Sequence, residues 1–134
     1  MNHRPCPFCE ISVNDKDSRI TGENRLAFVI RDGFPISKGH TLIIPKRHVT
    51  SFFNVTEDER QELFALIDEV KEHLENEYSP DAYNIGINDG SAAGQTVKHL
   101  HVHLIPRYKG DVVDPRGGVR WVIPDKADYW SGSE

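Results

Sequence analysis

Three histidines alternate with apolar residues in the segment His99-Leu100-His101-Val102-His103-Leu104-Ile105. Side chains point alternately to opposite faces of a β-strand, so the three histidines are expected to share one face and the apolar residues the other. A neutral imidazole is nucleophilic near pH 7 and also transfers protons at that pH. The segment therefore predicts a strand with one catalytic face and one core face.

Two other interpretations of this alternation compete with a catalytic role for the histidines. In the first, the histidines simply lie on a solvent-exposed face. Strict alternation of three uncommon residues that are only modest strand formers argues against chance. In the second, all three bind one metal ion. On a flat strand the outer two would lie about 13 Å apart, whereas zinc ligand nitrogens lie about 2.0–2.1 Å from the metal. The spacing favours separate roles along a phosphate.

The pattern His-φ-His-φ-His-φ-φ is similar to the signature of the histidine triad family. The segments 88–98, ahead of the histidines, and 39–45, further upstream, resemble the same family. The resemblance implies an enzyme that attacks a nucleotide α-phosphate with the middle histidine, His101. A covalent nucleotidyl-imidazole forms, and water then releases the nucleoside monophosphate. His103 is expected to donate a hydrogen bond to a phosphate oxygen, or a proton to the leaving group.

The resemblance also implies a set of nucleotide-binding residues. Asp32, eight residues before His40, matches the position at which the family contacts the ribose hydroxyls. A carboxylate accepts hydrogen bonds from both hydroxyls, although a plain turn aspartate before Gly33 is an alternative. The glycine-rich loop 90–94 lets backbone approach an anion closely. The polar residues expected near the phosphates are Asn88, Gln95 and Thr96, together with His103.

The two cysteines, Cys6 and Cys9, have the spacing of a zinc-ligand pair. A thioredoxin-like redox motif is less fitting, because no strand is expected before Cys6. A tetrahedral site needs two further ligands. The resemblance to zinc-containing bacterial or archaeal members of the family implies that these two ligands are His48 and His99. His3 is a competing ligand. The predicted cofactor is one structural zinc held by Cys6, Cys9, His48 and His99.

Short apolar runs predict the strands that position these residues. Segments 26–30 and 41–44 are expected to form a hairpin, and 83–88 a third strand before the histidine strand 99–105. Thr56 and Glu59 form a capping-box signature at the start of a long helix that ends at Ser79-Pro80. Its core face is expected to hold Leu63, Phe64, Ile67, Val70 and Leu74.

These elements predict an α+β fold, a mostly antiparallel sheet with one long helix packed on it. The 134 residues favour one domain over 1–134. Residues 108–134 form a C-terminal tail that matches the family less well, and 119–123 are compatible with a last short strand. The longest apolar run, 26–30, is far too short to span a membrane, and no signal peptide is visible. With only two cysteines, a cytoplasmic protein with reduced thiols is expected.

The formal net charge of -5 argues against a non-specific nucleic-acid coat, which needs a basic surface. The expected partner is a purine nucleotide or dinucleoside polyphosphate, because segment 95–98 resembles the dinucleoside polyphosphate hydrolase branch. Alternatives are a nucleoside phosphoramidate hydrolase, a nucleotidyl transferase or phosphorylase, and a nucleotide-binding regulator with weak catalysis. The resemblance also implies a homodimer.

Overall fold

The computed structural model describes residues 6–14 and 17–132, and the alternative ligand His3 lies outside these ranges. Short elements flank one long helix. In chain order they are α1 (Pro7–Ser12), β1 (Ile20–Glu23), β2 (Ala27–Arg31), β3 (Thr41–Pro45), the 3-10 helix η1 (Phe52–Asn54), α2 (Glu57–Tyr78), β4 (Ala82–Gly86), η2 (Ser91–Ala93), β5 (Val102–Arg107), η3 (Gly118–Val122) and α3 (Pro124–Ala127).

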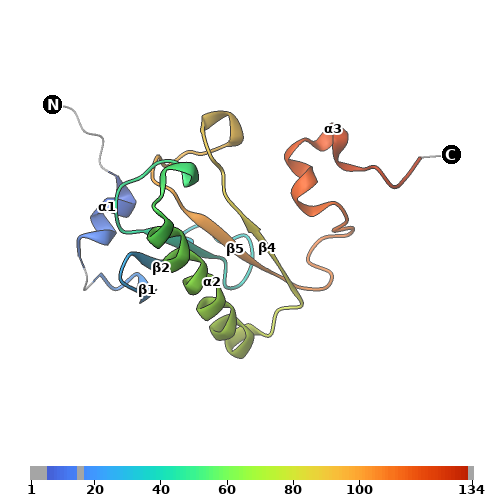
Figure 1. Cartoon of the computed structure of the whole chain (residues 1–134). Helices are drawn as coiled ribbons and strands as arrows, with labels where there is room; N and C mark the ends of the chain where they lie inside the picture. The colour runs from blue at the N-terminus through green and yellow to red at the C-terminus, as the bar shows by residue number, and fades with distance from the viewer. Residues whose placement is uncertain (1–5, 15–16, 133–134) are drawn as a thin grey trace.

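The strands form one five-stranded sheet in the order β1-β2-β3-β5-β4, and every neighbouring pair is antiparallel. The expected hairpin is confirmed, because β2 and β3 pair from Ala27 opposite Pro45 to Arg31 opposite Thr41. The α+β class with a long packed helix is also confirmed (Figure 1). Helix α1 and strand β1 were not predicted, because each is too short for a periodic signal.

Helices cover both faces of the central strands. On β2, Ala27 and Val29 belong to the core under α2, whereas Phe28 and Ile30 belong to a second core that includes Phe8 of α1. This alternation explains why four successive residues of β2 are buried. The histidine segment follows the same rule: Leu100, Val102 and Leu104 all pack into the α2 core.

Helix α2 begins with the predicted capping box. The Thr56 hydroxyl accepts from the Glu59 N–H at 3.0 Å, and the Glu59 carboxylate accepts from the Thr56 N–H at 2.8 Å. The Arg47 guanidinium contacts the same carboxylate at 2.8 and 2.9 Å and, more than any other group, lowers the pKa of Glu59. The helix ends at Ser79, whose φ of 51° is left-handed.

The predicted core face of α2 needs one correction. Phe64 is 50% exposed, whereas Leu66, which was not predicted, is 2% exposed. Leu63, Val70 and Leu74 are buried as expected. Position 66 follows 63 by three residues and precedes 70 by four, so the buried stripe runs through it, and position 64 lies beside the stripe.

The histidine strand starts later and ends later than predicted. Strand β5 begins at Val102, so His99 and His101 precede it, and it continues through Pro106 to Arg107. Leu100 instead donates its N–H to the carbonyl of Val49, outside the main ladder, at 2.8 Å. Pro106 is tolerated near the end of the strand, where one ladder hydrogen bond is dispensable.

The C-terminal tail contains no strand at the expected position. Residues Gly118–Val122 form η3 and Pro124–Ala127 form α3. Gly117, with φ of 89°, takes the left-handed conformation that starts η3. The tail projects from the body beyond strands β4 and β5 (Figure 1). No helix among the described residues is long and apolar enough to cross a membrane.

Candidate active site and metal centre

His101 is oriented by the backbone just before it. Its Nδ1 lies 2.9 Å from the carbonyl oxygen of His99. A carbonyl oxygen only accepts, so Nδ1 carries the proton and donates it. In the neutral ring, Nε2 then keeps its lone pair. That tautomer is the one a nucleophilic imidazole requires.

His103 lies beside His101 and is held by a second histidine. The His101 and His103 ring centroids are 5.1 Å apart. The Nδ1 of His103 lies 3.0 Å from Nε2 of His40, and Nδ1 of His40 accepts from the Ile36 N–H at 3.2 Å. Because Nδ1 of a neutral His40 is an acceptor, its Nε2 carries the proton and donates to His103. His103 then carries its own proton on Nε2, available as a donor.

Burial keeps both of these rings neutral. It is the first cause of the lowered pKa of His40 and of His103. Asp32 opposes this effect, since one carboxylate oxygen lies 3.4 Å from Nε2 of His40. The other Asp32 oxygen accepts from the Phe34 N–H at 2.8 Å, so the residue also forms the expected turn. Asp32 therefore lies next to His40, the partner of His103, rather than in a remote turn.

The polar residues predicted near the phosphates lie in and beside the loop between β4 and β5. Gln95 is buried, and its side-chain amide holds the loop closed. Its Oε1 accepts from the Gly90 N–H at 2.8 Å, and its Nε2 donates to the carbonyls of Thr50 and Val97 at 3.0 and 3.2 Å. Asn88 and Thr96 are exposed in the same loop.

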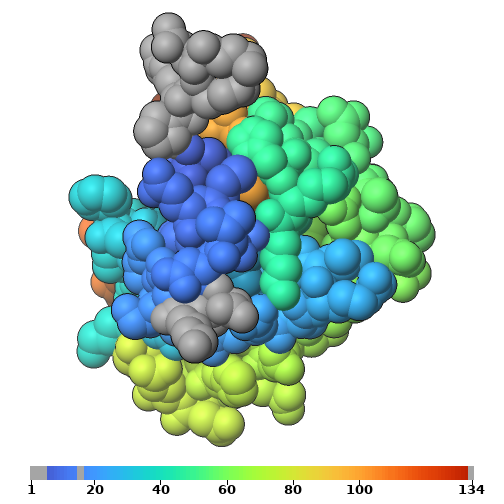
Figure 2. All heavy atoms as spheres, turned by 90° about the vertical axis from the view of Figure 1, so that its left-hand side faces the viewer, coloured from blue at the N-terminus to red at the C-terminus, as the bar shows by residue number. Residues whose placement is uncertain are grey.

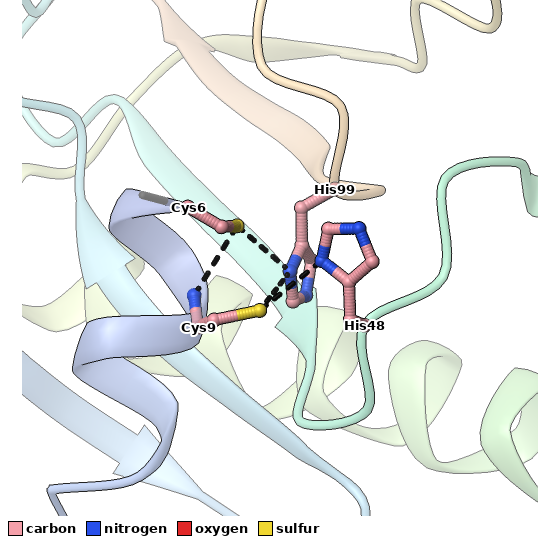
Figure 3. Close-up of side chains that lie close together, drawn as sticks. All are labelled: Cys6, Cys9, His48 and His99. Atoms are coloured by element: carbon pink, nitrogen blue, oxygen red, sulfur yellow. Dashed lines mark hydrogen bonds between the residues drawn. The ribbon is translucent and has the colours of Figure 1, made fainter. Parts of the chain in front are cut away.

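The cysteines and two histidines converge from three separate segments (Figure 3). Cys6 precedes α1 and Cys9 lies within it, His48 follows β3, and His99 precedes β5. Nδ1 of His99 lies 3.4 Å from the sulfur of each cysteine, and Nδ1 of His48 lies 3.1 Å from that of Cys9. The four ligand atoms all lie within 4.8 Å of one another.

This donor set fits a tetrahedral zinc ion. With Zn–S of about 2.3 Å and Zn–N of about 2.0–2.1 Å, a tetrahedral site separates sulfur from nitrogen by about 3.5 Å. The separations between sulfur and nitrogen in this group are close to that value. Burial, followed by the neighbouring Cys6 thiol, raises the pKa of Cys9 to about 11. A divalent cation offsets both effects, because it binds the thiolates directly.

The environment of His99 favours metal binding through one particular nitrogen. Its Nε2 donates to the carbonyl of Pro45 at 2.8 Å, which leaves the Nδ1 lone pair directed at the cysteines. Phe8 of α1 packs edge-on against both His99 and His101, with centroids 5.8 and 5.1 Å apart. Helix α1 lies at the surface beside the segment after β3 (Figure 2).

Among the described residues, His99 and His103 fall in two different groups of potential metal ligands. His99 is grouped with Cys6, Cys9 and His48, whereas His103 is grouped with Asp32 and His40. Two residues of the site, His40 and Phe8, carry no role that the sequence alone predicts. The spacing from Asp32 to His40 was the one available signal, because both residues bracket the turn of the predicted hairpin.

The class of protein is defined by two features. One is the five-stranded antiparallel sheet, and the other is the row of histidines at and just before the start of β5. The profile of the HIT domain family matches residues 13–110, and the chain belongs to this family.

Relatives with assigned names include two hydrolases and one phosphorylase. The chain is 48% identical over 77 residues to bis(5'-nucleosyl)-tetraphosphatase of Schizosaccharomyces pombe, which covers 58% of this chain and 42% of that protein. It is 39% identical over 132 residues to bis(5'-adenosyl)-triphosphatase of Saccharomyces cerevisiae, and the match covers 98% of this chain and 60% of that protein. It is 33% identical over 107 residues to AP-4-A phosphorylase of Mycobacterium tuberculosis, and the match covers 78% of this chain and 55% of that protein.

Solved structures of the family superimpose closely. A Zn-bound histidine triad protein from Mycobacterium smegmatis has a TM-score of 0.73 at 34% identity, covering 81% of this chain and 79% of that chain. A HIT family protein from Bacillus anthracis has a TM-score of 0.75 at 33% identity, and the match covers 82% of this chain and 78% of that chain.

Proposed function

We propose that this HIT-family enzyme is a nucleotide hydrolase that acts on dinucleoside polyphosphates through a covalent nucleotidyl-His101 intermediate. The observation that carries the proposal is the hydrogen bond from His101 Nδ1 to the carbonyl of His99, which leaves Nε2 free for attack. The names of relatives that are tetraphosphatases, triphosphatases or phosphorylases of such dinucleotides support the substrate class.

Nε2 of His101 attacks the α-phosphorus, and the bond from phosphorus to the bridging oxygen breaks. The departing polyphosphate oxygen takes the electron pair and receives a hydrogen bond or proton from Nε2 of His103. Water then attacks the nucleotidyl-histidine, and the P–N bond breaks to release the nucleoside monophosphate. Asp32 is proposed to accept from the ribose hydroxyls. Asn88, Thr96 and the loop held by Gln95 are proposed to face the phosphates.

We also propose that Cys6, Cys9, His48 and His99 hold one structural zinc. The donor set and its spacing support this assignment, as does the Zn-bound relative. Four protein ligands complete a tetrahedral shell and leave no position for water, so the metal contributes stability rather than chemistry. When bound, zinc would join α1, the end of β3 and the segment before β5.

A homodimer formed by extending the sheet is the proposed assembly. Strand β4 is an edge of the sheet, and its Ile85 side chain is 51% exposed. Sedimentation equilibrium tests this proposal, with a monomer mass as the contradicting result.

Turnover of diadenosine polyphosphates tests the reaction directly. Hydrolysis yields AMP, whereas capture of the same intermediate by inorganic phosphate yields ADP. The AP-4-A phosphorylase relative makes the second reaction the leading alternative. The assay is therefore run with and without phosphate, beside an adenylyl phosphoramidate. A protein that binds AMP but turns over none of these substrates would be a regulator.

A further inference from the structure

A cavity of about 600 Å³ opens between the sheet and the C-terminal tail. That volume lies within the range of roughly 300–1,000 Å³ for small-molecule sites. Its walls come from the connection between β2 and β3, from β4 and β5, and from the tail. The wall includes Ile36, Ser37, Gly86, Ile105, Arg107 and Trp121.

The cavity continues directly from the histidine row. On β5, His103, Ile105 and Arg107 alternate with buried residues and share one face. Gly86 of β4 pairs with His103 in the sheet register. Ile36, in the opposite wall, donates its N–H to His40. His103 is thus a neighbour of the wall residues Ile105, along β5, and Gly86, across the ladder.

Charged groups in the wall are already paired, either with one another or with a neighbouring residue. The Arg107 guanidinium binds Asp111 through two contacts of 2.7 and 2.8 Å and Asn84 at 2.6 Å. Asp114 pairs with Arg116 at 2.9 Å. No side chain of the described wall therefore offers a free cation to a phosphate chain, and the remaining surface is largely apolar.

One feature of the wall suits a nucleoside instead. Trp121 is 46% exposed, and its indole N–H is bound to the carbonyl of Arg116 at 2.8 Å, which leaves the ring to provide a stacking surface.

We infer that this cavity is the subsite for the leaving-group nucleoside of a dinucleoside polyphosphate, with its base stacked on Trp121. The inference rests on the proposed function and deepens it. His101 attacks the phosphate of the first nucleoside, and the polyphosphate beyond His103 carries the second nucleoside into the cavity. A small amine leaving group would leave this subsite unused.

Calorimetric binding of two ligands that cannot be cleaved at the α-phosphate tests the inference. One is bis-methylene diadenosine triphosphate, and the other is α,β-methylene ATP, which lacks the second nucleoside. Trp121→Ala should weaken binding of the dinucleotide roughly 5- to 150-fold, the range for loss of one base–aromatic stack. It should leave binding of α,β-methylene ATP unchanged. Trp121→Phe should retain most of the affinity.

Tyr129→Ala provides the matched control, because Tyr129 is an exposed tail aromatic outside the cavity wall. Equal effects of Trp121→Ala on both ligands, or no effect on either, would overturn the inference. A change in sedimentation with no selective loss of dinucleotide binding would mean that a second copy of the chain fills the cavity. If wild type binds neither ligand and His101 cannot be adenylylated, the proposed function itself fails.

Discussion

Nε2 of His40 lies 3.0 Å from Nδ1 of His103, at the end of a hydrogen-bond chain that begins at the backbone N–H of Ile36. The direction of this chain is set by the amide, which only donates. Each ring in turn accepts on Nδ1 and donates from Nε2. We therefore expect His40 to be a positioning residue that acts on the substrate through His103.

Replacing His40 tests this relationship. His40→Leu removes the donor and should lower kcat by about 10²-fold, the lower end of the range for general acid–base catalysis. Binding of AMP should change little. His40→Gln keeps an amide donor and should recover part of the loss. The matched control is His73→Ala, because His73 is exposed on α2. A merely structural role for His40 predicts equal losses in the Leu and Gln variants, with matching drops in melting temperature.

The same two rings predict a pH dependence of stability. Burial lowers the pKa of His40 and His103 below the ordinary value of 6.5, so below that pH the unfolded chain binds protons that the native chain does not. Their contribution to the unfolding free energy is complete above about pH 6.5 and decreases as pH falls through the window beneath it. Urea unfolding at pH 7.5 and 5.5 should show a smaller difference for His40→Gln than for wild type. An equal difference would contradict the assignment.

His101→Asn should abolish turnover and leave nucleotide binding largely intact, because only the attacking nitrogen is lost. The expected loss is several orders of magnitude, as for other covalent nucleophiles. Mass spectrometry of wild type quenched during turnover should locate an adenylyl group on His101. Near-normal activity of the variant in a clean preparation would refute the assignment.

Asp32→Ala should weaken binding of AMP by about 1.5–3 kcal/mol, the range for hydrogen bonds to a charged group. Because Asp32 also lies 3.4 Å from His40, a second ligand is needed to isolate the ribose contact. A 2′,3′-dideoxy nucleotide offers no hydroxyls, so its affinity should change much less. Equal losses for the two ligands would assign Asp32 to the histidine chain alone.

Local patterns predicted most of the fold. The hairpin, the capping box of α2 and the separation of Leu100, Val102 and Leu104 from the histidines all follow from side-chain periodicity. Periodicity gave no signal for α1, β1 or η3, which are only four to six residues long. It also misplaced the start of β5, because the backbone N–H of Leu100 binds the carbonyl of Val49, outside the ladder between β3 and β5.

The candidate site was predictable only where one segment carries several of its residues. The histidine row and the cysteine pair are local motifs, and their residue types state their chemistry. The contact between His40 and His103 joins residues 63 positions apart and depends on the pairing of β3 with β5. The cavity beneath the tail likewise depends on how η3 meets β4. Neither relationship can be predicted from the residue types within one segment.

Removal of the proposed zinc should reduce stability before it reduces activity. Metal analysis should find about one zinc per chain, as four protein ligands imply. The double variant Cys6→Ser/Cys9→Ser should lose the metal and melt at a lower temperature, because α1 is no longer tied to His48 and His99. Some turnover should remain, since His101 keeps its hydrogen bond to the backbone of His99.

Chelation of wild type provides the parallel measurement, and Ser12→Ala the matched control. Ser12 joins α1 to the body through a hydrogen bond to the carbonyl of Lys46 but supplies no metal ligand. This variant should keep its zinc and should respond to a chelator as wild type does. A metal-free wild type that melts like the double cysteine variant would overturn the zinc assignment. The cysteines would then serve only to pack α1 against the sheet, and His99 would be free to act with His101 and His103.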